Sequence, residues 1–195
     1  MKALKFLAAL FTATLFLAAC KESPSNAGAA KAPADPVSIA AIESEARGFP
    51  VGSTMSARTV YVFFDPQCPH CAQLWNSAKP LKSQARFVWI PVGIINKTSE
   101  AQGATLLAAK DPIASMDQHE ASILAKTGGI SASGDIEPLK AVVAKNTALM
   151  NRFGFASIPT IVAQHAQTGA LVTHEGALPT PALANLLGLQ IPAGQ

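Results

Sequence analysis

The feature that most constrains the fold is a pair of cysteines that directly follows a predicted buried strand. Residues 59–64 form a β-branched and aromatic run, which is typical of a strand inside a sheet, and the run stops before Asp65. Cys68 and Cys71 come next, and Pro69 between them suits the first turn of a helix. The pattern predicts a strand that leads into a helix, with both cysteines at the start of that helix.

The start of a helix is a chemically favourable position for a cysteine. Unpaired backbone N–H groups and the positive end of the helix stabilise an anion there, so we expect Cys68 to be a thiolate. A free cysteine with a pKa near 8.5 is only about 3% ionised at pH 7, whereas cysteines in such motifs have pKa values of about 3.5–7. Cys68 is therefore the candidate nucleophile, and Cys71 is the candidate resolving thiol, which attacks the mixed disulfide.

The two residues between the cysteines are expected to set the direction of electron flow. A group that stabilises the Cys68 thiolate stabilises the reduced protein and makes the disulfide a stronger oxidant, and His70 is such a group. Proteins with such motifs span reduction potentials from about −270 to about −120 mV, which corresponds to about 7 kcal/mol for two electrons. Pro69 and His70 are therefore predicted to tune the pair.

Cysteines at this spacing also occur in haem, zinc and structural disulfide sites. Attachment of c-type haem needs a histidine directly after the second cysteine, where this chain has Ala72. A zinc site needs a second group of ligands, but His119, His165 and His174 are scattered, so we expect neither a metal nor another cofactor. A structural disulfide between the two cysteines would close a very short loop and add little stability, and this alternative stays open.

The N-terminus has the layout of a bacterial export signal. Two lysines precede an apolar run over 6–19, which is shorter than the roughly 20 residues that a membrane-spanning helix needs. The run ends before Cys20 in a sequence similar to the lipobox of bacterial lipoproteins. We therefore expect a signal peptide over 1–19, a lipid on Cys20 that anchors the protein to a bacterial membrane, and a flexible tether over 20–36. Ordinary cleavage near Ala19 is the alternative.

The charge balance does not indicate a nucleic-acid partner. The chain has 15 lysines and arginines against 12 aspartates and glutamates, and removal of the expected leader leaves 13 against 12. No basic stripe or run of like charge remains, so we expect neither nucleic acid nor an anionic surface as a partner.

The chain has three cysteines. If Cys20 carries a lipid, Cys68 and Cys71 are the two thiols that remain for chemistry in the mature chain.

The middle of the chain predicts alternating strands and helices. A helical pattern over 37–47 lies within a segment expected to be a short linker with a helix, over 37–56. A second strand-like run over 87–95 follows the cysteine helix, which implies a parallel pair with a right-handed crossover. Residues of about 99–134 show a helical pattern interrupted near Pro112, which predicts an insertion of two helices and a loop.

The end of the chain completes an α/β domain. A long helix is predicted up to Gly154, two strands joined by a turn at Gly169 follow, and a last helix ends near Leu187. The elements are then β-α-β, a helical insertion, α and β-β-α, around a central mixed sheet. We expect this domain over 57–190 and a short tail over 191–195.

Several other conspicuous side chains are expected to be structural. We expect Trp75 and Trp89 to lie in the core and Asp65 to shape the turn before the first cysteine. A role for Asp65 in carrying protons is the alternative. His119 falls on a polar face of its predicted helix, so we expect it to be solvated.

Three segments are similar to one known family. They are 60–71, which contains the cysteine motif, 109–112 (Ala-Lys-Asp-Pro) and 176–179 (Gly-Ala-Leu-Pro). On these segments the chain resembles the DsbC/DsbG family of periplasmic disulfide isomerases and reductases, most of all the DsbG branch. The resemblance covers about 57–189 and implies a thioredoxin-like fold. It also implies that Pro159 is a cis-proline, and that Ile158 and Pro159 lie beside the sulfurs and bind the substrate chain.

The resemblance implies an activity and partners as well. A member of this family is a thiol–disulfide oxidoreductase of the isomerase or reductase type, which acts on exported, cysteine-containing proteins in the periplasm. A membrane thiol reductase recycles such a protein by keeping its cysteine pair reduced. For this chain the expected pair is Cys68 and Cys71.

Three features differ from the usual pattern of the family. Only residues 21–57 are available where the family has its dimerisation domain, so we expect a monomer. Ile158 stands where the family usually has threonine, and the Pro69-His70 dipeptide is that of the oxidant DsbA. A DsbA-like oxidase, recycled by a membrane oxidase, therefore remains the alternative. A lipoprotein chaperone or assembly factor with a structural disulfide is the alternative without enzymatic activity.

Overall fold

The computed structural model describes residues 34–192. The expected signal peptide, the lipidated Cys20 and most of the expected tether lie outside the described residues, as does the end of the expected tail. Within the described part of the chain, no helix is both long enough and apolar enough to cross a membrane.

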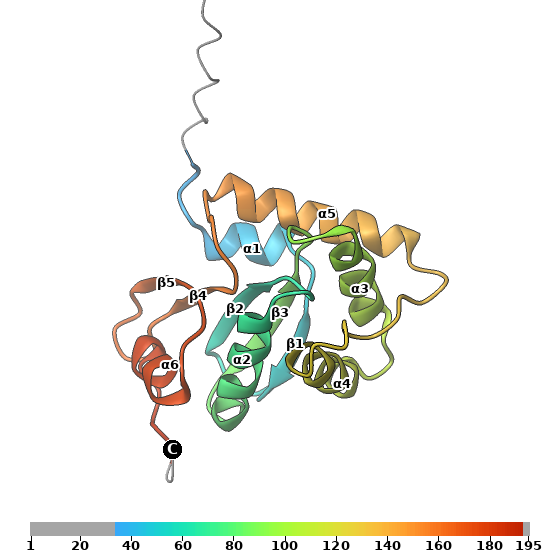
Figure 1. Ribbon diagram of the computed structural model, residues 1–195. Coiled ribbons are helices and arrows are strands. Elements are labelled where there is room, and N and C mark those ends of the chain that lie inside the picture. Colours follow the sequence, from blue (N-terminus) through green and yellow to red (C-terminus); the bar gives the residue numbers. More distant parts are fainter. Residues whose placement is uncertain (1–33, 193–195) are drawn as a thin grey trace, which may run out of the picture. The chain divides into compact units, whose positions relative to one another are not determined.

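A five-stranded mixed sheet forms the centre of the fold (Figure 1). The central strand β2 is parallel to β3, and all other neighbouring strands are antiparallel. The spatial order is β1-β3-β2-β4-β5. The strands are β1 (Phe49–Gly52), β2 (Thr59–Phe64), β3 (Arg86–Pro91), β4 (Thr160–Gln164) and β5 (Leu171–Glu175).

Helices cover both faces of this sheet, and each face has its own apolar core. Alternate residues of β2 point to opposite faces, so that Val62 and Phe64 pack with α2 and α6, whereas Tyr61 and Phe63 pack with α1 and α5. The insertion after β3 packs α3 against α5 and α4 against α2. The helices are α1 (Ile39–Glu45), α2 (Pro69–Ala78), α3 (Lys97–Ala108), α4 (Pro112–Leu124), α5 (Glu137–Arg152) and α6 (Thr180–Leu187).

The predicted order of elements is confirmed, including the two inserted helices that meet at Pro112. Asp111 caps α4 with its carboxylate, and Pro112 begins the helix, where its missing N–H costs nothing. Trp75 and Trp89 are both buried, with their rings packed edge to face at 5.0 Å between centroids. The expectation that both tryptophans lie in the core is therefore correct.

The expectation that 37–56 is only a linker with a short helix needs correction. Ile42 of α1 is buried in the core beneath α5, and β1 pairs with β3 as an edge strand of the sheet. β1 has only four residues and contains Pro50, which an edge strand tolerates because its outer N–H groups need no partner. So short a strand gives almost no periodic signal in the sequence.

Candidate active site

Cys68 is the N-cap of α2, the residue directly before the first helical position. Its Sγ accepts a hydrogen bond from the backbone N–H of Cys71 at 3.3 Å. Its own N–H donates to the carbonyl oxygen of Asp65 at 3.0 Å, which closes the turn between β2 and α2. Pro69 begins the helix. The junction of strand and helix therefore turns unpaired N–H groups toward this sulfur.

The two sulfurs differ in acidity because their surroundings differ. The hydrogen bond with the Cys71 side chain, and next the backbone N–H groups of Cys71 and His70, lower the pKa of Cys68 to about 7 in spite of burial. Burial raises the pKa of Cys71, and the sulfur of Cys68 raises it further. Both residues are free thiols in the structure. Cys68 can thus ionise near neutral pH while Cys71 keeps its proton.

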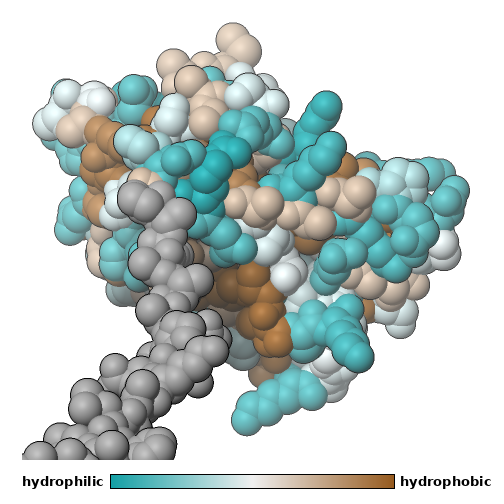
Figure 2. Space-filling model, turned by 90° about the horizontal axis from the view of Figure 1, so that it is seen from above, coloured by the Kyte–Doolittle hydropathy of each residue, from teal (hydrophilic) through white to brown (hydrophobic). Residues whose placement is uncertain are grey.

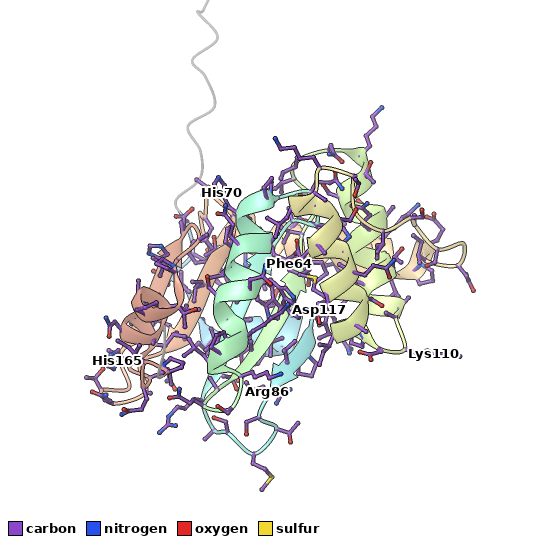
Figure 3. All side chains as sticks on the ribbon, turned by 60° about the horizontal axis from the view of Figure 1, so that its bottom comes forward. Phe64, His70, Arg86, Lys110, Asp117 and His165 are labelled. Atoms are coloured by element: carbon purple, nitrogen blue, oxygen red, sulfur yellow. The ribbon has the colours of Figure 1, made fainter. Side chains whose placement is uncertain are left out.

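His70 lies at the start of α2 with its side chain exposed (Figure 3). Its Nδ1 is 3.0 Å from Oε1 of Gln73, one turn further along the helix. The charge of His70 contributes to the lowered pKa of Cys68, but it is the smallest of the causes. His70 is therefore in the predicted place for a tuning residue, with a smaller influence than the backbone around it.

The segment before β4 lies next to Cys68. The peptide bond between Ile158 and Pro159 is cis. The carbonyl oxygen of Ile158 is 3.9 Å from Sγ of Cys68, within range of a hydrogen bond from a thiol. The two segments meet because β2 and β4 are neighbours in the sheet. The carbonyl of Ile158, at the cis bond to Pro159, thus lies beside the first cysteine, as the family resemblance implies.

Asp65 ties the loop that carries Cys68 to the next loop of the sheet. Its carboxylate is fully buried and accepts three backbone hydrogen bonds. Oδ1 accepts from the N–H of Gln67 at 2.8 Å, and Oδ2 accepts from Ile94 and Ile95 at 2.7 and 2.9 Å. The expectation that Asp65 shapes the turn is confirmed, and its carboxylate also joins the ends of β2 and β3.

His119 is buried, so the expectation that it is solvated is wrong. Its Nε2 lies 2.6 Å from the carbonyl oxygen of Pro66, and its Nδ1 accepts from the N–H of Ile130 at 3.1 Å. Both nitrogens are satisfied in the neutral ring with the proton on Nε2, and burial lowers the pKa of the imidazole. The polar neighbours of His119 suggested a solvated face, but α4 packs this face against α2 and against the loop that leads from β2 to Cys68.

Glu120 is a candidate functional residue that the sequence analysis missed. Its side chain is 1% exposed, and neither carboxyl oxygen has a hydrogen-bond partner. Burial raises the pKa of Glu120 to about 9, and the charge of Cys68 acts in the same direction. The carboxyl group is therefore neutral at pH 7, as an unpaired buried acid has to be. The available signal was helical spacing, since Glu120 lies four residues after Met116 and three before Ile123, both buried.

Side-chain hydrogen bonds attach the insertion to the loop between β2 and α2, which carries Cys68. Nε2 of the buried Gln102 donates to the carbonyl oxygens of Gly128 and Ile130, both at 2.8 Å. Gln67, next to the first cysteine, donates to the side chain of Gln102 and to the carbonyl of Gly128. On the α2 side, Nε1 of Trp75 donates to Asp117 of α4 at 2.7 Å. Hydrogen bonds thus hold the insertion against both the loop that carries Cys68 and the helix α2.

Within residues 34–192, no three or more histidine, cysteine, aspartate or glutamate side chains are grouped so that they could hold a metal ion. His174 lies in β5 and His165 directly after β4. His165 lies well apart from His70 (Figure 3). His165 is therefore not part of the arrangement around the cysteines.

Known proteins are similar to this chain in sequence and in fold. Residues 53–190 match the family described as a thioredoxin-like domain. The chain is 37% identical over 145 residues to the thiol:disulfide interchange protein DsbG of Pseudomonas aeruginosa, and this match covers 70% of this chain and 54% of that protein. The chain is 36% identical over 104 residues to DsbG of Escherichia coli, and this second match covers 52% of this chain and 42% of that protein. The chain thus spans about half the length of the curated relatives that it matches.

Solved structures show the same fold at lower sequence identity. A periplasmic thioredoxin-like protein from Salmonella enterica serovar Typhimurium is similar with a TM-score of 0.55 at 18% identity. The similarity covers 72% of this chain and 88% of that one. At this identity the likeness concerns the fold alone.

Proposed function

This chain belongs to the family of thioredoxin-like domains, and we propose on that basis that it is a thiol–disulfide oxidoreductase that uses Cys68 and Cys71. The observation that carries the proposal is the position of Cys68 as the N-cap of α2, with its Sγ bonded to the N–H of Cys71. The hydrogen bond with the Cys71 side chain, followed by the backbone N–H groups of Cys71 and His70, lowers the pKa of Cys68 to about 7. A sulfur of this kind is a nucleophile at neutral pH.

The proposed reaction has two exchange steps. The Cys68 thiolate attacks one sulfur of a substrate disulfide, so that a mixed disulfide forms and the other substrate sulfur leaves as a thiolate. The Cys71 thiol then loses its proton and attacks the mixed disulfide, which releases the second substrate thiolate and joins Cys68 to Cys71. Two electrons pass from the protein to the substrate. If a substrate thiolate attacks the mixed disulfide instead, the substrate is isomerised and the protein stays reduced.

We propose the reductase or isomerase direction, with Pro69 and His70 as tuning residues and the Ile158-Pro159 segment as backbone that contacts the substrate. The similarity to DsbG supports this direction. The acidity of Cys68 supports it as well, because a pKa of about 7 is that of thioredoxin, whereas the strong oxidant DsbA has a value of about 3.5. A moderately stabilised thiolate makes a weaker oxidant.

The reduction potential against a glutathione buffer tests the direction. We expect a value more reducing than about −180 mV, the potential of protein disulfide isomerase, and a reduced resting state in cells. A value near about −120 mV with a disulfide resting state would establish a DsbA-like oxidase instead. A Cys68→Ala variant is the control, since it has no pair to equilibrate.

We also propose where the protein acts and with which partners. It acts on exported, cysteine-containing proteins in the periplasm, as a monomer held at a membrane by a lipid on Cys20, and a membrane thiol reductase recycles it. The apolar leader that ends before Cys20 supports the anchor. A Cys20→Ala variant is expected to leave the membrane fraction. Unchanged fractionation of this variant would rule out the lipid.

A further inference from the structure

Glu175, the last residue of β5, accepts two backbone hydrogen bonds from the segment that precedes β4. Its Oε2 accepts from the N–H groups of Ala156 and Ser157 at 2.9 and 2.6 Å. All three residues are exposed. A carboxylate forms stronger hydrogen bonds with N–H groups than a neutral acceptor does. One exposed side chain therefore fixes two consecutive peptide groups.

This arrangement is unusual for a surface carboxylate. Hydrophilic side chains cover much of the face that Figure 2 shows, and charged side chains on an edge strand such as β5 hinder its pairing with other chains. A charge with that role needs contact with solvent and no fixed partner. The carboxylate of Glu175 instead joins segments that are 18 and 19 residues apart in the sequence. Its contacts therefore indicate a role in the segment that it holds.

Two further hydrogen bonds fix the start of β4. The N–H of Gly176 donates to the carbonyl oxygen of Pro159 at 2.7 Å. Oγ1 of the buried Thr160 donates to the carbonyl oxygen of Ser157 at 2.5 Å. Gly176 has a φ of +109°, which glycine adopts readily, so the chain turns directly after β5. The end of β5 and the start of β4 are therefore joined around the cis peptide bond.

The carbonyl of Ile158 lies in the middle of this fixed segment and next to the reactive cysteine. Its oxygen is 3.9 Å from Sγ of Cys68. The hydrogen bonds that fix the segment come from β4, from β5 and from the residue after β5, not from the loop that carries Cys68. The position of Ile158 relative to Cys68 therefore depends on β5, which is separated from β2 by β4 in the sheet.

We propose that Glu175 is a positioning residue, which holds residues 156–159 in the geometry that binds the backbone of a peptide substrate beside Cys68. This inference rests on the proposed function, in which the segment of Ile158 and Pro159 contacts the substrate. Glu175 does not touch the reacting sulfurs and acts only through the two N–H groups that it accepts. We therefore expect it to affect binding of the substrate chain and not the attack by the thiolate.

The test compares a peptide disulfide with a disulfide that contains no peptide group. Pre-reduced full-length protein is mixed with an excess of either a synthetic peptide disulfide or hydroxyethyl disulfide, and the loss of free thiols is followed at several concentrations. Glu175→Ala removes the acceptor, whereas Glu175→Gln keeps an uncharged oxygen acceptor. Thr173→Ala is the matched control, because Thr173 is exposed and lies on the same face of β5.

We expect Glu175→Ala to raise the half-saturating concentration of the peptide disulfide about tenfold, as for one backbone hydrogen bond that is no longer aligned. Its maximal rate is expected to stay within about twofold. Glu175→Gln is expected to raise the half-saturating concentration only about threefold, because its oxygen still accepts. With hydroxyethyl disulfide, and in the pH titration of the Cys68 thiolate, all variants are expected to equal the unchanged protein.

Three results would overturn the inference while leaving the proposed function in place. The first is an unchanged half-saturating concentration of the peptide disulfide for Glu175→Ala. The second is an equal loss with both disulfides, which would assign Glu175 to the structure of the whole site. The third is an equal rise for Thr173→Ala, which would assign the effect to the edge strand in general. Failure of the unchanged protein to react with either disulfide would instead contradict the proposed function, and the inference with it.

Discussion

The acidity of Cys68 depends on contacts that the helix start supplies. The hydrogen bond with the Cys71 side chain is the largest cause of the lowered pKa, followed by backbone N–H groups of the first turn, and the charge of His70 comes last. His70, in the dipeptide between the cysteines, therefore lowers the pKa of Cys68 more through its backbone N–H than through its charge. Cys71 keeps its proton at neutral pH, because burial raises the pKa of its thiol.

This order of causes predicts how two substitutions differ in their effect on the pKa of Cys68. Cys71→Ala removes the side-chain contact and is expected to raise the pKa of Cys68 more than His70→Ala does, since the latter removes only the smallest cause. Ultraviolet absorbance of the thiolate, followed against pH, measures both values. A larger rise for His70→Ala would show that the imidazole charge controls the nucleophile.

Glu120 predicts a pH dependence of stability. Its pKa is raised from 4.5 in the unfolded chain to about 9 in the fold, chiefly by burial. Above about pH 4.5 the unfolded chain loses a proton that the folded protein keeps, so stability falls as pH rises, at about 1.4 kcal/mol per pH unit. Glu120→Gln removes this loss, and its stability relative to the unchanged protein is expected to grow steadily from pH 5 to 8, by about 1.4 kcal/mol per unit.

Denaturant unfolding at several pH values measures this difference. The change of this stability difference with pH is more informative than its value at one pH, because a buried glutamine adds N–H groups that also need partners. A difference that stays constant from pH 5 to 8 would mean that Glu120 ionises normally in the folded protein.

At the scale of elements, the site is built at one end of the sheet, where the loop after β2, the loop after β3 and the segment before β4 meet. Asp65 joins the loop after β2 to the loop after β3, and His119 attaches α4 to the same region. Cys68, the proposed nucleophile, is therefore held by elements on both sides and not by α2 alone. Such support keeps a reactive side chain in a fixed geometry.

Two aspartates that accept backbone hydrogen bonds are predicted to differ in their contribution to stability. Asp65→Ala leaves three N–H groups in or near the interior without an acceptor, so we expect a loss of about 3 kcal/mol in the free energy of unfolding. Asp111→Ala removes an exposed cap of α4, and we expect a loss of about 1 kcal/mol. Denaturant unfolding of both variants provides the comparison, and equal losses would contradict the structural role given to Asp65.

The sequence predicted elements well where the signal was local. The run over 59–64, the proline at the helix start and the break at Pro112 each specify structure through nearby residues. β1 was missed because four residues give no period. The burial of His119 and Glu120 was missed because the side of α4 that is covered depends on α2, a helix some 40 residues away in the chain.

At the scale of the whole molecule, the sheet order assembles the site from distant segments. The cysteine motif could be recognised from sequence alone, and so could the proline before β4, through the family resemblance. The contact of Ile94 and Ile95 with Asp65 could not, because it depends on the pairing of β2 with β3 and on the carboxylate of Asp65. The chemistry was thus predictable from the motif, whereas the contacts that hold the loop with Cys68 required the fold.

The most direct test of the account is to trap its covalent intermediate. In a Cys71→Ala variant the second exchange step is blocked, so the mixed disulfide between Cys68 and its substrate should persist. We predict adducts with exported proteins that disappear on reduction and are absent from a variant that lacks both cysteines. Absence of adducts from Cys71→Ala, or the same adducts in the variant without Cys68, would contradict the assignment of Cys68 as the nucleophile.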